Sequence, residues 1–239
     1  LYVRDIIGDK DAGKAKNLLA EAAGGNLSGS EGAPLPKLEK MPFEALGWIL
    51  SVLADDKGSA AEVGSIVRFL MNRTTETAST ANFVTDYGDG GWLIMYSNRR
   101  ADGVLLEALI KAQPNNDLIP KLVRGLLANR TKGHWGSTQE NVFILLALDK
   151  YFNAFEKVTP DFVTRIWLGG TYAGEEAFKG RSVDSNVLNI PMSYLLGNAA
   201  LPAAGGRQDV GVPLIIDRQG AGRLYYRIGM KYAPKNLKL

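Results

Sequence analysis

Apolar residues recur at helical spacing through the first two thirds of the chain. Between Ala60 and Met71 they fall at every third or fourth position, and the same spacing returns in Ala101–Ala112 and Leu118–Leu127. A weaker pattern predicts a short helix over Ala12–Ala23, followed by a loop rich in Gly, Ser and Pro. The pattern therefore predicts a largely helical region.

The last helix of this region, Val142–Phe155, is apolar almost all round. A helix without a wide polar face is expected to be buried on more than one side. Ser137 and Glu140 stand just before it with the spacing of a capping box. The preceding helix has Asp117 as its expected N-cap and Pro120 in its first turn, where the missing N–H is harmless.

The helical region contains an internal repeat. A shift of 56 residues places Gly47 on Gly103 and Arg68 on Arg124, together with many apolar matches. With one residue inserted, the triplet Asn72-Arg73-Thr74 meets a second Asn-Arg-Thr triplet that starts at Asn129. Repeated helical hairpins bury their apolar faces only against their neighbours. The repeat therefore predicts either an α-solenoid or a closed α/α toroid.

After Pro160 the apolar spacing changes from helical to alternating. The expected strands are Arg165–Leu168, Thr171–Ala173, Asn186–Leu195, Val212–Asp217 and Leu224–Tyr232. The last of these alternates most regularly between apolar and polar positions, as in a sheet with one buried face. We expect a multidomain α and β protein, with helical hairpin repeats in residues 1–158 and an antiparallel β-sandwich in residues 159–239.

Composition excludes several kinds of chemistry. The 239 residues include no cysteine, so disulfides, thiolate metal sites and a cysteine nucleophile are ruled out within the chain. The formal net charge of +3 does not by itself indicate a nucleic acid partner. No apolar run approaches the roughly 20 residues of a membrane span. Because the chain starts at Leu1 in mid-pattern, we expect an excised or processed piece whose targeting signals have been removed.

Candidate reactive residues are few. His134 is the single histidine, which rules out a histidine-rich metal site and makes it the necessary base of any Ser-His-Asp arrangement. The adjacent carboxylates of Asp55-Asp56 and Glu175-Glu176 do not face each other and are expected to be solvated turn charges. The Gly-rich loop Asp86–Trp92 lacks the Lys-Ser/Thr of a phosphate-binding loop and is expected to be a surface turn. The Asn-Arg-Thr triplets fit an N-glycosylation acceptor, but their recurrence favours a structural role. We assign no catalytic, cofactor-binding or metal-binding residue.

Several blocks of sequence resemble the alpha-2-macroglobulin family, especially its bacterial-type members. The resemblance covers roughly residues 42 to 239. The blocks are Tyr96–Asp102, His134–Asn141 with the following Leu-rich helix, Ile166–Gly169, Phe178–Arg181, Ile190–Met192 and Gly222–Gly229. The first two are similar to the late part of the family's thioester domain, and the others are similar to the segment that follows it.

The resemblance implies an α/α toroid that is inserted in a CUB-like β-sandwich. This chain would contain only part of the toroid. It also implies a non-enzymatic, broad-spectrum protease inhibitor of host defence, secreted or periplasmic, that traps proteases after they cut it. Its partners would be those proteases and other domains of the same protein, with no cofactor, no nucleic acid and no membrane insertion. The family's thioester needs Cys-x-Glu-Gln, and this chain has no cysteine. The reactive site would therefore lie upstream of Leu1, or the protein never had one.

Two other functions remain open from the residues. The first is an enzyme on an α/α toroid, such as a glycosidase, a lyase or a terpene cyclase. A cyclase needs clustered aspartates on facing helices to hold Mg²⁺, and Asp55-Asp56 is the one pair in the helical region that could contribute. The second is an interaction scaffold built on an α-solenoid.

Overall fold

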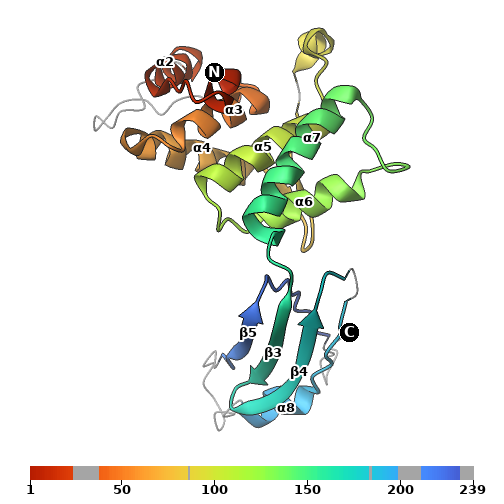
Figure 1. Ribbon diagram of the computed structural model, residues 1–239. Helices are drawn as coiled ribbons and strands as arrows, with labels where there is room; N and C mark the ends of the chain where they lie inside the picture. The colour runs from red at the N-terminus through yellow and green to blue at the C-terminus, as the bar shows by residue number, and fades with distance from the viewer. Residues whose placement is uncertain (24–37, 86, 183–184, 199–210, 232–239) are drawn as a thin grey trace, which may run out of the picture. The chain divides into compact units, whose positions relative to one another are not determined.

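The structure is a computed structural model that describes residues 1–23, 38–85, 87–182, 185–198 and 211–231. The chain divides into two compact units, Leu1–Ala154 and Phe155–Leu239. The first unit is helical and the second holds a small antiparallel sheet (Figure 1). The protein therefore combines helices and sheet, while the domain boundary after residue 158 stays a prediction.

Unit 1 consists of helices joined by short turns. Its α-helices are α1 (Tyr2–Ile6), α2 (Ala12–Ala23), α3 (Phe43–Leu53), α4 (Ala60–Arg73), α5 (Asn98–Ala112), α6 (Leu118–Ala128) and α7 (Thr138–Tyr151). Its short 3-10 turns are η1 (Leu38–Lys40), η2 (Lys57–Ser59) and η3 (Gly88–Ile94). Strands β1 (Thr75–Glu76) and β2 (Ala81–Asn82) form a two-residue antiparallel pair between α4 and η3. The helices predicted from periodicity are thus confirmed, whereas the predicted Gly/Ser/Pro loop lies outside the described residues.

Helix α5 is the centre of unit 1, because α3 packs on one side of it and α7 on the other (Figure 1). The apolar faces of these helices and of α4 and α6 make one core. Its largest fully buried side chains are Leu19, Leu46, Leu50, Leu53, Ile66, Leu70, Phe83, Leu105, Leu106, Leu109, Ile119 and Leu122. Most of them stand at the apolar positions that predicted the helices, so the periodicity marks the core correctly.

The repeated segments fold alike, each into a pair of helices: α3 with α4, and α5 with α6. The equivalent glycines of the two repeats, Gly47 and Gly103, each lie against the next helix of the array. A methyl group on Gly47 would lie 2.8 Å from Val104 Cγ1 of α5, and one on Gly103 would lie 3.2 Å from the Cα of Ile144 on α7. Each glycine therefore allows the next helix of the array to approach closely.

Two helix starts show how capping works in this unit. The predicted capping box of α7 is confirmed in one half, because Ser137 Oγ accepts a hydrogen bond from the Glu140 backbone N–H at 3.2 Å. The prediction for α6 is confirmed in the position of the N-cap but not in its side-chain bond. Asp117 occupies the N-cap position without a side-chain bond, and Asn116 Oδ1 instead accepts from the Leu118 N–H at 2.9 Å. Asn116 reaches that N–H from one residue further back, as in an Asx turn.

The prediction that the last helix is buried on more than one side is wrong. In α7 the buried side chains are Ile144, Ala147 and Tyr151, which lie on one side of the helix. Leu145 and Leu146 are exposed, because α7 is followed by the π-helical turn η4 (Phe152–Glu156) rather than by a second helix. Helix α7 therefore lacks the hairpin partner that α3 and α5 have.

Unit 2 contains a three-stranded antiparallel sheet in the order β4-β3-β5. Its elements are β3 (Asp161–Leu168), β4 (Thr171–Lys179), α8 (Met192–Asn198) and β5 (Leu214–Ala221). The predicted hairpin turn at Gly169-Gly170 is confirmed, because Leu168 pairs with Thr171. Phe162 and Phe178 stand directly opposite each other, with their ring centroids 5.0 Å apart. This aromatic pair and the ladder hydrogen bonds fix the register of the sheet.

Two strand predictions in unit 2 are wrong. Residues 186–191 are irregular and Met192–Asn198 is helical, with Pro191 placed just before the helix, where proline is tolerated. Residues 223–231 form no strand despite their alternation, and Tyr226, Ile228 and Met230 are exposed. Alternation produces a strand only where a neighbouring strand supplies backbone partners, and in the described residues this segment pairs with neither of the two outer strands of the sheet, β4 and β5.

Candidate functional site

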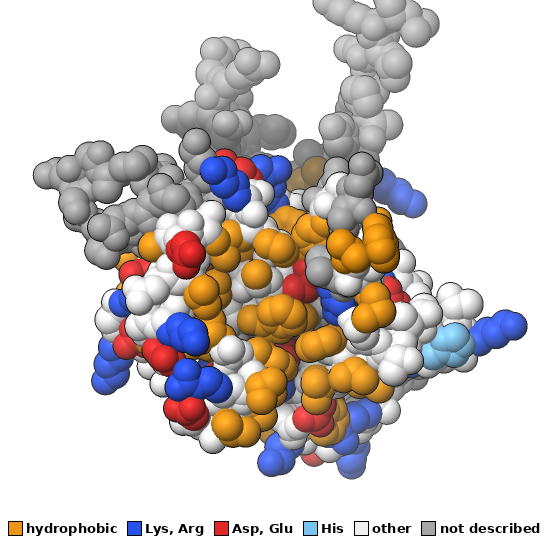
Figure 2. Space-filling view, turned by 90° about the horizontal axis from the view of Figure 1, so that it is seen from above, with side chains coloured by type: hydrophobic (Ala, Val, Ile, Leu, Met, Phe, Trp, Pro, Cys, Tyr) orange, Lys and Arg blue, Asp and Glu red, His pale blue; other side chains and the backbone are white. Residues whose placement is uncertain are grey.

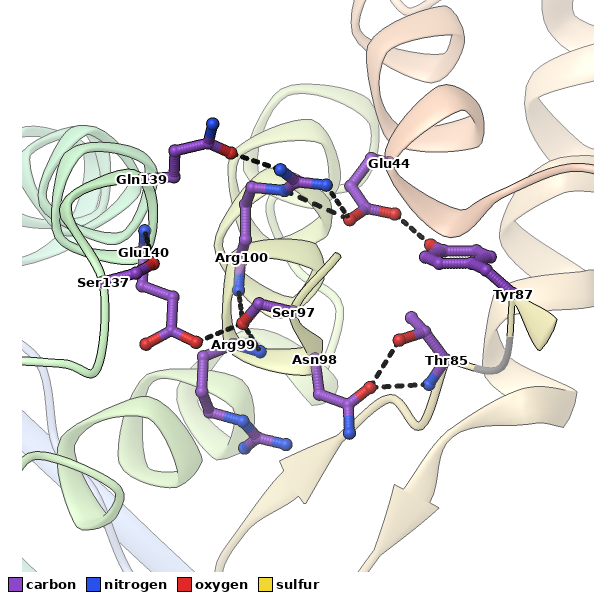
Figure 3. A network of polar contacts seen from close by, with 10 residues as sticks. All are labelled: Glu44, Thr85, Tyr87, Ser97, Asn98, Arg99, Arg100, Ser137, Gln139 and Glu140. Atoms are coloured by element: carbon purple, nitrogen blue, oxygen red, sulfur yellow. Dashed lines mark hydrogen bonds and ion pairs between the residues drawn. The ribbon is translucent and has the colours of Figure 1, made fainter. Parts of the chain in front are cut away.

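The densest polar network of unit 1 lies where the N-terminal ends of α3, α5 and α7 come together (Figure 3). Its centre is Arg100 in the first turn of α5. The guanidinium donates to Glu44 Oε1 of α3 from Nε at 3.3 Å and from Nη2 at 3.0 Å. On the other side, Nη1 donates to the Gln139 side-chain oxygen of α7. One buried arginine thus joins three helices.

The N-cap residue of α5 belongs to the same network. Ser97 Oγ accepts from the backbone N–H groups of Arg99 at 3.1 Å and Arg100 at 3.3 Å, so it caps the helix. Its hydroxyl donates to the Glu140 carboxylate of α7. The Glu140 carboxylate therefore bonds to the neighbouring helix α5 and does not complete the reciprocal half of its own capping box.

Two further contacts hold the segment between β2 and α5. The Tyr87 hydroxyl donates to Glu44 Oε2, and Asn98 Oδ1 accepts from the Thr85 backbone N–H at 2.8 Å. Burial, followed by the nearby Glu44 carboxylate, raises the pKa of Tyr87 above its usual range. The phenol is therefore a fixed hydrogen-bond donor and not a source of phenolate.

The segment held in this way presents apolar side chains to solvent. Trp92 is 72% exposed, and Leu93, Met95 and Tyr96 are exposed as well. Met95 adopts a left-handed backbone conformation (φ 45°), which is unusual for a residue with a side chain. Figure 2 shows hydrophobic side chains gathered in the middle of this side of unit 1, with charged ones mostly at the rim. The expectation of a surface turn that carries Trp92 is confirmed, although Asp86 at its start lies outside the described residues.

Asp102 of α5 is a buried carboxylate next to the network. Its Oδ1 accepts from the Phe83 N–H at 2.7 Å, and its Oδ2 lies 3.0 Å from Arg99 Nη1. The second contact is an ion pair without hydrogen-bond alignment, because Oδ2 has no hydrogen-bond partner among the described residues. Burial raises the pKa of Asp102 to about 7, against the opposing effects of Arg99 and of the Phe83 N–H. Asp102 is therefore a buried carboxyl group that titrates near neutral pH.

The residues singled out from the sequence lie elsewhere. His134 sits in the turn before α7, where its backbone pairs with Thr131 and its Nδ1 lies 3.0 Å from the Trp135 carbonyl oxygen. The Asp55 carboxylate accepts from Lys10 and lies 3.1 Å from Lys111 Nζ, so it belongs to an ion-pair cluster in the turn after α3. Neither His134 nor Asp55 therefore contacts the network around Arg100 through the bonds described.

The other carboxylate pair is not in a turn. Glu175 and Glu176 lie in β4, where their side chains alternate: Glu175 Oε2 accepts from Arg165 Nε at 3.0 Å, and Glu176 Oε2 accepts from Asn186 Nδ2 at 3.3 Å. The prediction of turn charges is therefore wrong for this pair, because β4 extends to Lys179 and not only to Ala173.

Sequence reasoning missed Glu44, Arg100 and Gln139 as a functional cluster, yet a signal was present. Glu44 and Arg100 are 56 residues apart, so they occupy the same position in successive repeats. Asp55 and Lys111, which also pair, have the same separation. Opposite charges at equivalent positions of neighbouring parallel helices are placed to meet, and the repeat could have been searched for them.

The arrangement consists of polar side chains that hold the ends of three helices together. Its polar groups bond to one another, and no group of three or more His, Asp or Glu side chains in the described ranges could hold a metal ion. Every helix of the described ranges is too short or too polar to span a lipid bilayer. A rigid polar base that carries exposed aromatic and aliphatic side chains is typical of a protein-binding surface.

Comparisons with known proteins give two relatives. Over 171 residues the chain is 31% identical to a protein described as "Alpha-2-macroglobulin homolog" from Nostoc sp., which covers 72% of this chain and 8% of that relative. Over 248 residues it is 23% identical to "Circularly permutated Ras protein 2" from Dictyostelium discoideum, which covers 82% of this chain and 6% of that relative. No model of a known protein family matches.

The chain is similar to part of an alpha-2-macroglobulin homolog. It spans less than a tenth of the length of either relative. The Nostoc relative therefore supports the resemblance seen in the sequence blocks. The similarity concerns a small part of that relative and does not establish the activity of the whole protein.

Proposed function

We propose that this chain is a structural part of an alpha-2-macroglobulin-like, broad-spectrum protease inhibitor that is secreted or periplasmic. The observation that carries the proposal is the 31% identity to the Nostoc relative over 72% of the chain. In this role the chain has no catalytic residue and no cofactor of its own. Its partners are the trapped protease and the other domains of the same protein, and a thioester, where present, lies outside these residues, since the chain has no cysteine.

The geometry of unit 1 supports a curved helical array, as in a partial α/α toroid. Tyr2 of α1 donates to Glu107 Oε2 of α5 at 2.7 Å, and its ring centroid lies 6.4 Å from that of Phe143 on α7. Helix α1 precedes α3 in the array but still reaches α5 and α7. An extended solenoid, in which each repeat contacts only its neighbours, does not bring such distant helices together, whereas a ring does.

The geometry of unit 2 supports one layer of a CUB-like β-sandwich. An open groove of about 580 Å³ is lined by Leu214 and Ile216 of β5 and by Leu224, Tyr226 and Ile228 of the segment after it. Sandwiches are built from two such inner faces that interdigitate. The alternating row at residues 224–228 therefore has the side chains of a sandwich strand, although it forms no ladder in the described residues.

The experiment is a trapping assay on the intact protein that contains this chain. Trypsin is incubated with an excess of the protein and then tested with casein and with a small peptide nitroanilide. A trap blocks the large substrate and spares the small one, since the protease stays active inside it. Equal loss of both activities would identify an ordinary active-site inhibitor, and no loss of either would refute the proposal. The isolated chain should leave both activities unchanged.

A further inference from the structure

Helix α7 carries an apolar row that no other helix of the described part of unit 1 covers, on the side that faces away from the buried Ile144. The row consists of Val142, Leu145 and Leu146, which are 49%, 56% and 45% exposed. They stand at positions i, i+3 and i+4, so they form one continuous stripe on the helix. Three adjacent exposed aliphatic side chains on one helix mark a candidate interaction surface.

The helices of the array can be aligned through their capped ends. Ser97 caps α5 and Ser137 caps α7 in the same way, with the side chain accepting from backbone N–H groups of the first turn. The alignment is independently supported by packing: Val104 of α5 lies against Gly47 of α3, and its counterpart Ile144 of α7 lies against Gly103 of α5. The three helices thus use the same positions to contact one another.

In this alignment the row of α7 matches residues that are buried in the other two helices. Leu145 and Leu146 correspond to Leu105 and Leu106 of α5, which are fully buried. Through the 56-residue repeat they also correspond to Ile49 and Leu50 of α3, which are buried as well. What differs is the following element, because α3 and α5 pack against α4 and α6, whereas α7 is followed by η4.

We propose that the row of Val142, Leu145 and Leu146 is a docking surface for an amphipathic helix that packs on α7 as α6 packs on α5. This inference rests on the helical ring proposed above, and it names the surface through which the ring continues. The occupant is defined by the helices that already fill the equivalent position. In α6 the residues toward the core are Leu118, Ile119, Leu122, Val123 and Leu126, and in α4 they are Ile66, Val67 and Leu70.

The partner helix therefore has aliphatic residues at i, i+4 and i+8 and polar residues on its outer face. A small patch of three aliphatic side chains is well below the area of a stable homodimer interface. A single helix, in contrast, is matched to a stripe of this length. The surface thus favours a helical segment over a second copy of this chain.

The test uses a fluorescent peptide with the sequence of residues 116–130, which spans α6, added to the complete 239-residue chain. We expect saturable binding by fluorescence anisotropy. The double substitution Leu145→Glu and Leu146→Glu should weaken it by about tenfold or more, since it places two charges in the centre of the contact. Val84→Glu is the matched control, because Val84 is 61% exposed in unit 1 and lies outside α7.

A peptide in which the residue equivalent to Leu122 is replaced by Glu should fail to bind. Circular dichroism of each variant shows that the fold is kept, since the substituted side chains are on the surface. Absence of saturable binding, or equal binding by the double variant, would overturn the inference. A dimer of the unmodified chain in sedimentation analysis that the double variant abolishes would overturn it too, since a second copy would then be the occupant. The assay contains no protease, so its result is separate from the trapping test.

Discussion

Arg100→Met is the substitution that tests most directly how the helical unit is held together. It keeps the length of the side chain and removes its charge and its N–H donors. Arg100 donates two hydrogen bonds to Glu44 and one to Gln139, so the substitution breaks the contacts of α5 with both α3 and α7 at their N-terminal ends. The substitution leaves Glu44 behind, which is buried and accepts hydrogen bonds from Arg100 and the Tyr87 hydroxyl.

The expected cost follows from this geometry. At the 3.0 Å separation between Nη2 and Oε1, the attraction between the charges is about 5 kcal/mol with an effective dielectric constant of 20. Much of that attraction offsets the desolvation of the two groups. Removing one partner leaves the other buried and charged, and we expect the free energy of unfolding to fall by about 3–5 kcal/mol.

The assay is urea unfolding followed by circular dichroism at 222 nm, which reports mainly on the helices of unit 1. The double variant Glu44→Leu with Arg100→Met should be more stable than Arg100→Met alone, because it leaves no unpaired charge. Lys121→Met is the control, because Lys121 and Glu76 form a surface pair within unit 1, and such pairs contribute about 0–1 kcal/mol. A cost below about 1 kcal/mol for Arg100→Met, or strictly additive effects of Glu44→Leu and Arg100→Met, would refute the reasoning.

Three further predictions concern the same unit. Gly103→Ala should cost about 1–3 kcal/mol, because its methyl group would press on the α7 backbone at Ile144, whereas Gly64→Ala, with open space around it, should stabilise α4 by about 1 kcal/mol; urea unfolding of both variants measures the difference. Ser137→Ala should cost about 1 kcal/mol in the same assay through loss of the α7 cap, and a cost equal to that of an exposed serine elsewhere would contradict this. Folding favours the protonated form of Asp102, so the stabilisation from that form is complete in acid and is lost as the pH rises through about 7. Between pH 5 and pH 8 the free energy of unfolding should therefore fall by at most about 3 kcal/mol, and Asp102→Asn should flatten that profile.

The fold was predictable where one local rule decides the structure. The 3.6-residue period identified α2 and α4 to α7 because each of these helices buries one stripe in a shared core. The hairpin of β3 and β4 was predictable because Gly169-Gly170 turns the chain where the apolar run ends. These features depend on residues close in sequence, so a single chain carries their signal.

The failures came where the outcome depends on a distant neighbour. The alternation in residues 223–231 indicates a strand, but a strand also needs backbone partners, and in the described residues this segment pairs with no strand of the sheet. The apolar periphery of α7 indicates burial on several sides, but burial needs a helix to cover it. In both cases the residue pattern describes the surface correctly and cannot supply the segment that would cover it.

The candidate site also depends on residues that are distant in sequence. No local motif marks Glu44, since it is one acidic residue in the first turn of an apolar helix. It becomes meaningful only beside Arg100, at the same position of the next repeat, and the pair Asp55 and Lys111 follows the same rule near the other end of the helices. The glycines Gly47 and Gly103 are also equivalent positions, and each allows the next helix to approach, at Val104 and at Ile144. The two ion pairs between repeats share one separation, 56 residues, so a search for complementary charges at the period of a repeat would find contacts that a search for motifs cannot.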